Sequence, residues 1–143
     1  MEVSQISIFL ENRSGGLADV VDVLARNGVD MKAVSVADMS DFGILRVIVD
    51  DADRTRGVLK EAGFTVDKTD VVAVEVPDRP GGLADTLHAL RDGGINVEYM
   101  YSAARRSGER AVIIFRFDDV PKAIETLRRS GIEVLDRFDD LRH

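Results

Sequence analysis

The segment Asn12-Arg13-Ser14-Gly15-Gly16-Leu17-Ala18-Asp19 decides the fold, because it occurs twice in the chain. Its second copy reads Asp78-Arg79-Pro80-Gly81-Gly82-Leu83-Ala84-Asp85 and begins 66 positions later, at residue 78 instead of residue 12. Further matches, Asp51 with Asp119 and Gly63 with Gly131, follow at a spacing of 68. A period of this length indicates a repeated supersecondary unit. We therefore expect two domains of the same fold, residues 1–69 and residues 70–143.

Both copies show the same order of strand and helix patterns. Alternating apolar residues predict a strand before each glycine pair, and apolar residues at helical spacing follow the pair. Ser14 is the expected N-cap of the first such helix, and Pro80 is expected in the first turn of its counterpart. Asp51 and Asp119 are expected to open a second helix in each copy. The strands are expected at residues 6–10, 29–38, 43–49, 64–68, 72–76, 95–104, 110–117 and 132–138, with turns at 39–42 and 105–109.

The resulting order of strand, helix, strand, strand, helix and strand is that of a ferredoxin-like βαββαβ unit. We predict an α+β protein of two such repeats, whose antiparallel sheets carry helices on one face. The third strand of each repeat has apolar residues on both faces, so the open face is expected to seek a partner. We expect the repeats to form an eight-stranded sheet and the chain to form a homodimer with two-fold symmetry. The expected contact residues are Ile44, Ile48, Val112 and Ile114.

Composition excludes several classes of function. The 143 residues are 45% hydrophobic, which suffices for the core of a folded protein. A net charge of −7 disfavours nucleic-acid binding, because phosphate backbones would be repelled. The sequence shows no cationic apolar leader and no apolar run near the ~20 residues that cross a bilayer, so we expect a cytoplasmic protein without membrane contact. Without cysteine, and with only His88 and His143 as histidines, it offers little for metal, cofactor or covalent chemistry.

The repeated glycine pair is the candidate binding site. Glycines at a helix start let a ligand approach the backbone, where unpaired N–H groups and the helix dipole attract an anion. A carboxylate suits this place, and a phosphate would suit it too. The alternative is structural: Gly15, Gly16, Gly81 and Gly82 make a tight turn and permit close packing. The repetition of the pair after the same kind of strand adds support for a binding site, and both interpretations stay open.

The loops Glu11-Asn12-Arg13-Ser14-Gly15-Gly16-Leu17 and Asp78-Arg79-Pro80-Gly81-Gly82-Leu83 resemble the first loop of ACT domains, regulatory modules that bind amino acids beside many enzymes of amino-acid metabolism. Two copies fill the chain. The segments Asp41-Phe42-Gly43-Ile44-Leu45-Arg46 and Glu98-Tyr99-Met100-Tyr101-Ser102 are similar to those of stand-alone tandem ACT proteins in particular. The resemblance implies a regulatory protein that senses a free amino acid, has no cofactor and catalyses no reaction of its own.

In ACT domains the ligand typically lies where two units meet, so the resemblance also implies the site residues. It pairs Asn12 with Asp30 in the first copy and Asp78 with Asn96 in the second. Each pair offers one amide and one carboxylate, and the carboxylate can accept hydrogen bonds from a ligand ammonium group. The full expected ligand-binding set is Asn12, Arg13, Ser14, Gly15, Gly16, Leu17, Asp30, Asp78, Arg79, Pro80, Gly81, Gly82, Leu83 and Asn96.

Each of these residues also has an ordinary interpretation. Asn12 and Asp78 are common turn formers that bond their own backbone, and Asp30 and Asn96 could end a glycine turn. Single loop arginines such as Arg13 and Arg79 are mostly solvated. Tyr99, Met100 and Tyr101 lie on an expected strand, where some face a core instead of a ligand. His88 is expected beside an apolar helix stripe, in a structural or idle role.

Two other functions remain open from the sequence. The ferredoxin-like fold also hosts acylphosphatases, and Arg13 or Arg79 with Asn96 faintly resembles their phosphate-binding pair, although the surrounding loop does not match. A module without a ligand, acting as the regulatory partner of a separate metabolic enzyme, would show the same sequence features. Calorimetric titration with amino acids separates a sensor from such a module.

Overall fold

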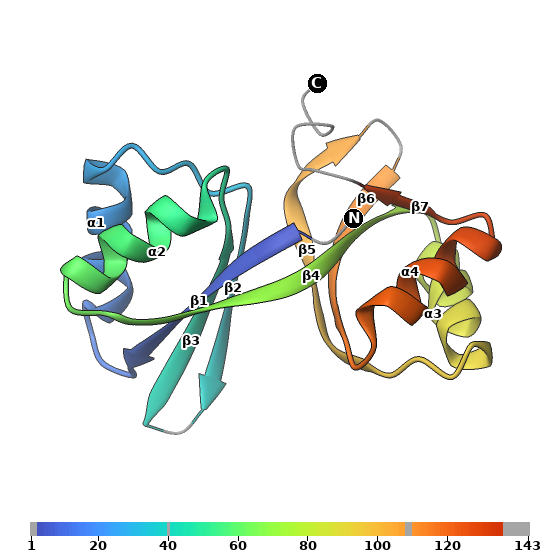
Figure 1. The fold of residues 1–143 in the computed structure, drawn as a ribbon, viewed down its shortest axis with the longest axis horizontal. Coiled ribbons are helices and arrows are strands. Elements are labelled where there is room, and N and C mark those ends of the chain that lie inside the picture. The colour runs from blue at the N-terminus through green and yellow to red at the C-terminus, as the bar shows by residue number, and fades with distance from the viewer. Residues whose placement is uncertain (1–2, 40, 108–109, 136–143) are drawn as a thin grey trace. The chain divides into compact units, whose positions relative to one another are not determined.

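The computed structural model describes residues 3–39, 41–107 and 110–135 (Figure 1). The chain divides into two compact units, residues Ser4–Thr69 and residues Asp70–His143 with Met1–Val3. We call them the first and the second repeat, and each is described by itself. Within the described ranges, no helix combines the length and the apolar character needed to cross a membrane.

The first repeat has the predicted βαββαβ order. Its strand order is β2-β3-β1-β4, and β3 lies antiparallel to both β1 and β2. Figure 1 shows both helices on the same face of these strands. The elements are β1 (Val3–Glu11), α1 (Gly16–Arg26), β2 (Ala33–Met39), β3 (Phe42–Ile48), α2 (Ala52–Glu61) and the beginning of β4 (Thr65–Pro77).

The second repeat has the same topology, with strand order β7-β4-β6-β5. Helices α3 and α4 again lie on one face of the strands (Figure 1). The elements after β4 are α3 (Gly82–Asp92), β5 (Val97–Ser107), β6 (Arg110–Phe117), α4 (Val120–Arg129) and β7 (Glu133–Leu135). The prediction of an antiparallel α+β fold with two ferredoxin-like repeats is confirmed.

Strand β4 corrects the predicted connection between the repeats. Separate strands were expected at residues 64–68 and 72–76, with Thr69 and Asp70 between them. Instead, a single strand of 13 residues ends the first repeat and begins the second. The sheet in the described part of the chain therefore has seven strands, and the prediction of eight is wrong.

Each repeat has its own hydrophobic core between helices and strands. In the first repeat Leu45, Val47 and Val49 face the helices, where they pack with residues such as Leu24 and Leu59. In the second repeat Ile113, Phe115 and Phe117 face the helices. The rings of Phe115 and Phe117 are stacked, with their centroids 5.2 Å apart.

Several predicted boundaries differ from the structure. Strand β2 begins at Ala33 instead of residue 29, because the Val29 N–H donates to the Leu24 carbonyl at 2.9 Å and closes the end of α1. Strand β5 begins at Val97 instead of residue 95 and runs into the expected turn at 105–109, of which residues 108–109 lie outside the described residues. Strand β7 covers Glu133–Leu135. Residues 136–138 of the predicted strand lie outside the described residues, as does His143.

The four residues of the expected dimer contact differ in their exposure within the single chain. Ile48, Val112 and Ile114 are buried within the single chain, with 0%, 1% and 0% of their surface exposed. Only Ile44, which is half-buried, keeps surface for a contact. The homodimer and its contact stay predictions.

Candidate functional site

The two helices that follow the glycine pairs begin in the same unusual way. Gly15 and Gly81 are their N-caps, with left-handed φ angles of 85° and 88°, and no side chain caps either helix. The prediction that Ser14 caps α1 is therefore wrong, because the left-handed glycine takes that position. Pro80 precedes the N-cap Gly81, so its expected place in the first turn is wrong as well.

Helices α2 and α4 begin differently, as the sequence predicts. The Asp51 carboxylate accepts a hydrogen bond from the Arg54 N–H at 3.0 Å, and the Asp119 carboxylate accepts one from the Lys122 N–H at 3.1 Å. Such caps occupy the N–H groups that every helix start leaves without an intrahelical partner. Side chains therefore cap α2 and α4, whereas α1 and α3 have no side-chain cap; we call these two uncapped N-termini open starts.

The first turn of α1 offers open hydrogen-bond donors. The Gly16 N–H donates to the Arg13 carbonyl at 3.2 Å and the Asp19 N–H to the Gly15 carbonyl at 3.0 Å. Among the described residues, no backbone carbonyl accepts a hydrogen bond from the N–H groups of Leu17 and Ala18. These N–H groups and the positive end of the helix dipole favour an anion at this position. The start of α3 repeats the pattern, with the Asp85 N–H donating to the Gly81 carbonyl.

The second glycine of each pair approaches the backbone closely, and at Gly82 no Cβ atom would fit without a shift. A Cβ atom on Gly82 would lie 2.0 Å from the Pro77 carbonyl oxygen, and one on Gly16 would lie 3.1 Å from the Glu11 carbonyl oxygen. The structural interpretation of the glycines therefore holds at these positions. A bulky substitution there would report on folding and would not isolate ligand binding.

The structure separates the two residues of each expected ligand-binding pair. Asn12 follows Glu11, which lies opposite Phe42 at the start of β3. The Asn12 N–H donates to the Asp41 carbonyl at 2.9 Å. Asp30 lies near the other end of β3, where its carboxylate contacts Lys32 Nζ at 3.0 Å. Lys32 is itself buried, with 5% of its surface exposed. Asn12 and Asp30 are therefore at opposite ends of the first repeat.

Asp78 and Asn96 are separated in the same way. Asp78 follows Pro77, which lies opposite Arg110 at the start of β6. Asn96 lies at the other end of this strand, where its N–H donates to the Asp118 carboxylate at 3.1 Å. The two residues could contact a common ligand only if they came from different ACT-like units.

The loop arginines are held by acidic side chains of their own repeat. Arg13 Nη2 lies 2.9 Å from Asp19 Oδ2, and its Nε lies 3.6 Å from Glu11 Oε2. Arg79 Nη2 lies 3.9 Å from Asp85 Oδ2. These side chains are more than half exposed, so each ion pair contributes little to stability and can exchange partners.

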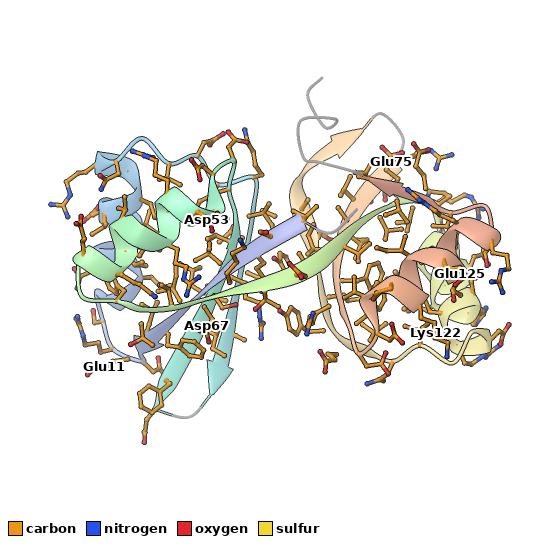
Figure 2. All side chains as sticks on the ribbon, viewed as in Figure 1. Glu11, Asp53, Asp67, Glu75, Lys122 and Glu125 are labelled. Carbon is orange, nitrogen blue, oxygen red and sulfur yellow. The ribbon has the colours of Figure 1, made fainter. Side chains whose placement is uncertain are left out.

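A cavity of about 640 Å³ lies within the first repeat, beside the open start of α1. Glu11, at the end of β1 (Figure 2), is one of its lining residues. Arg13 and Gly16 of the predicted set reach it, whereas its aromatic residues escaped the sequence analysis. The lining is Phe9, Leu10, Glu11, Arg13, Gly16, Phe42, Gly63, Phe64 and Thr65. The sequence offered one local signal for these residues, because Phe64 directly follows Gly63 at the end of α2. The three chain segments that form the lining come together only in the folded repeat.

His88 lies on the exposed surface of α3 and lines a second cavity, of about 590 Å³, between α3 and α4. Its other lining residues are mostly charged and include Lys122 and Glu125 of α4 (Figure 2). Within the described residues, no cluster of three or more histidine and acidic side chains could hold a metal ion.

A family model for the ACT domain pair matches residues 1–140. The chain belongs to the ACT domain family. The resemblance of the two loops to ACT domains is thereby confirmed. In this family context, the open starts of α1 and α3 are the first-loop regions of two successive ACT domains.

Solved structures have a similar fold. Protein BT0572 from Bacteroides thetaiotaomicron is 41% identical, with a TM-score of 0.88, over 94% of this chain and 92% of that one. The ligand-free regulatory subunit of aspartate kinase from Thermus thermophilus is 20% identical, with a TM-score of 0.67, over 90% of each chain. The regulatory subunit of aspartate kinase from Thermus flavus is 18% identical, with a TM-score of 0.64, over 92% of this chain and 94% of that one. No curated protein matches the chain significantly.

Proposed function

We propose that this ACT pair is a regulatory protein that binds a free amino acid at the open start of α1 or α3 and catalyses no reaction itself. One observation carries the proposal: a left-handed glycine replaces the side-chain cap at these two helix starts, whereas aspartates cap α2 and α4. Because the donors of the first turn stay open, a ligand carboxylate can accept hydrogen bonds there. The proposed ligand-binding residues remain the two loops with Asp30 and Asn96.

The ammonium group of the ligand needs an acceptor close to these donors. Glu11 provides one in the first repeat, where its side chain is 77% exposed at the end of β1. The second repeat has Pro77 at the corresponding place. Asp30 and Asn96 lie at the far ends of their repeats, so they would take part only where a second ACT unit approaches the loop. A homodimer or a larger assembly would supply that unit.

The biological output would be control of an enzyme of amino-acid metabolism in the cytoplasm. The ACT family supports this role, and the aspartate kinase subunits with the same fold are named as regulatory. An amino acid that binds one conformation or assembly better than another shifts the population toward it. The activity of the partner enzyme would change with this shift in population.

The acylphosphatase alternative has less support. In the second repeat, Arg79 and Asn96 lie at opposite ends of β6, so they do not converge on one phosphate. In the first repeat, Arg13 is paired with Asp19 and Glu11. A module without any ligand is the stronger alternative, and it differs from a sensor only in the binding measurement.

The test is isothermal titration calorimetry of the full chain with the common amino acids. The matched variants are Leu17→Pro and Leu83→Pro, which remove one open N–H at the second helical position of α1 and α3. Proline is accepted at this position in the same protein, because Pro121 is the second residue of α4. Loss of a charge-assisted hydrogen bond should weaken binding about tenfold or more in the repeat that holds the ligand.

Folding of both variants is checked by circular dichroism. The anion site is wrong if both variants stay folded and bind as tightly as the parent. If no amino acid binds the parent, the module without a ligand is supported instead.

A further inference from the structure

The two repeats differ at the cavity beside the first loop. Strand register defines the corresponding positions, because Glu11 lies opposite Phe42 in the first repeat as Pro77 lies opposite Arg110 in the second. By the same correspondence Phe9 is replaced by Glu75. At the repeat spacing of 68 positions, Phe64 is replaced by Ile132 and Thr65 by Glu133. Two of the three aromatic residues at the first cavity therefore have charged counterparts in the second repeat.

The aromatic side chains of the first cavity keep apolar surface available for a ligand. Phe42 is 58% exposed and Phe9 is 38% exposed, although both have large rings. Phe64 is half-buried and packs against the core of the repeat, so it forms a fixed wall. Covering such rings with an apolar group is favourable in proportion to the area removed from water.

Charged groups lie at the same cavity and can orient a ligand. The Glu11 carboxylate can accept from an ammonium group, and the Arg13 guanidinium can donate to a carboxylate. Gly16, the first residue of α1, also reaches the cavity, which places the open helix start beside the rings. The cavity volume of about 640 Å³ lies within the range of roughly 300–1,000 Å³ found for small-molecule sites.

We infer that the first repeat selects an α-amino acid with a large apolar side chain, aromatic or branched aliphatic, and that the second repeat does not share this site. The inference rests on the proposed function and specifies its ligand class. The side chain lies among Phe9, Phe42 and Phe64, the ammonium group contacts Glu11, and the carboxylate takes the Arg13 guanidinium and the helix-start donors. Glu75, Arg110 and Glu133 would leave charges against an apolar side chain in the second repeat, which is unfavourable. Each chain therefore binds one such ligand.

The experiment is calorimetric titration of the full chain with phenylalanine, leucine, glycine and aspartate. Phenylalanine and leucine should bind at one site per chain, and glycine and aspartate should bind at least about tenfold more weakly, because burial of an apolar side chain contributes 1.4 kcal/mol or more. Phe42→Ser should weaken phenylalanine binding about tenfold, since it removes an exposed ring without disturbing the core. The matched control is Arg110→Ser, at the corresponding position of the second repeat, which should leave the affinity unchanged.

The outcomes separate this inference from the proposed function. Binding of glycine or aspartate without preference for phenylalanine or leucine would overturn the selectivity and leave amino-acid sensing intact. Unchanged phenylalanine affinity in Phe42→Ser, or a loss confined to Arg110→Ser, would overturn the placement of the site. Binding of none of the four amino acids would overturn this inference, whereas the proposed function is overturned only if the other common amino acids also fail to bind.

Discussion

At the residue scale, the two glycines of each pair have different roles that structure alone separates. The first glycine supplies a left-handed φ angle, whereas the second allows the helix start to approach the end of the preceding strand. Sequence reasoning identified both pairs, because their repetition is visible. It could not assign the roles, because φ angles and the distance to the Pro77 carbonyl arise only in the folded chain.

Gly82→Ala should lower the free energy of unfolding by about 2 to 3 kcal/mol, because the new Cβ atom would clash with the Pro77 carbonyl oxygen at 2.0 Å. Gly16→Ala, whose contact with the Glu11 carbonyl oxygen is 3.1 Å, should cost about 1 kcal/mol. Gly57→Ala is the matched control in α2, where nothing lies within 4 Å, and it should stabilise by about 0.5 to 1 kcal/mol. Urea unfolding followed by circular dichroism measures all three. A Gly82→Ala variant as stable as the parent would contradict the close approach.

The aromatic site residues show the opposite limit of sequence reasoning. Phe9, Phe42 and Phe64 belong to three segments, and each fits the pattern of an ordinary strand or strand end by itself. Their joint position depends on the register of β1 with β3 and on the turn that begins β4. Arg13 and Gly16 were found because the repeated loop contains them.

At the element scale, the capping pattern of the helices gives a contrast that can be measured. Asp119→Ala and Asp51→Ala should each lower the free energy of unfolding by about 1 kcal/mol, because each carboxylate accepts a hydrogen bond from the first turn of its helix. Ser14→Ala should change stability by less than about 0.5 kcal/mol, because Gly15 is the N-cap of α1 and no side chain caps the helix. Thermal or urea unfolding of the three variants tests the pattern. A loss of about 1 kcal/mol in Ser14→Ala would restore the capping role that its sequence position suggests.

Element order was readable from the sequence, whereas the continuity of β4 was not. Apolar periodicity and the two aspartate caps mark four helices and most strands, since each signal is local. Thr69 and Asp70 are polar and follow the charged Asp67 and Lys68, so they suggested a connection. In the structure they lie inside β4, where the Asp70 carbonyl accepts a hydrogen bond from Arg116 Nη1 at 2.8 Å. That contact joins residues 46 positions apart, which no local pattern reveals.

At the scale of the whole molecule, the homodimer remains the prediction to test first. Light scattering at micromolar concentration should give a mass of about twice the 15.7 kDa of one chain. Val34 and Val36 are the candidate contact residues, because they are 45% and 54% exposed on β2, a terminal strand of the sheet order. The double variant Val34→Lys/Val36→Lys should give a monomer, since lysines on an edge strand oppose strand pairing. A dimer mass that persists in this variant would place the contact elsewhere, and a monomeric parent would remove the dimer.

The central claim is that a free amino acid binds at the open start of α1. Its most direct test is a ¹H–¹⁵N correlation NMR titration of the full chain with phenylalanine. The account predicts that the amides of Leu17 and Ala18 shift on binding together with those of Glu11 and Phe42, while the amides of residues 82–84 stay in place. Shifts confined to the second repeat, or no shift around α1 at saturating phenylalanine, would contradict it.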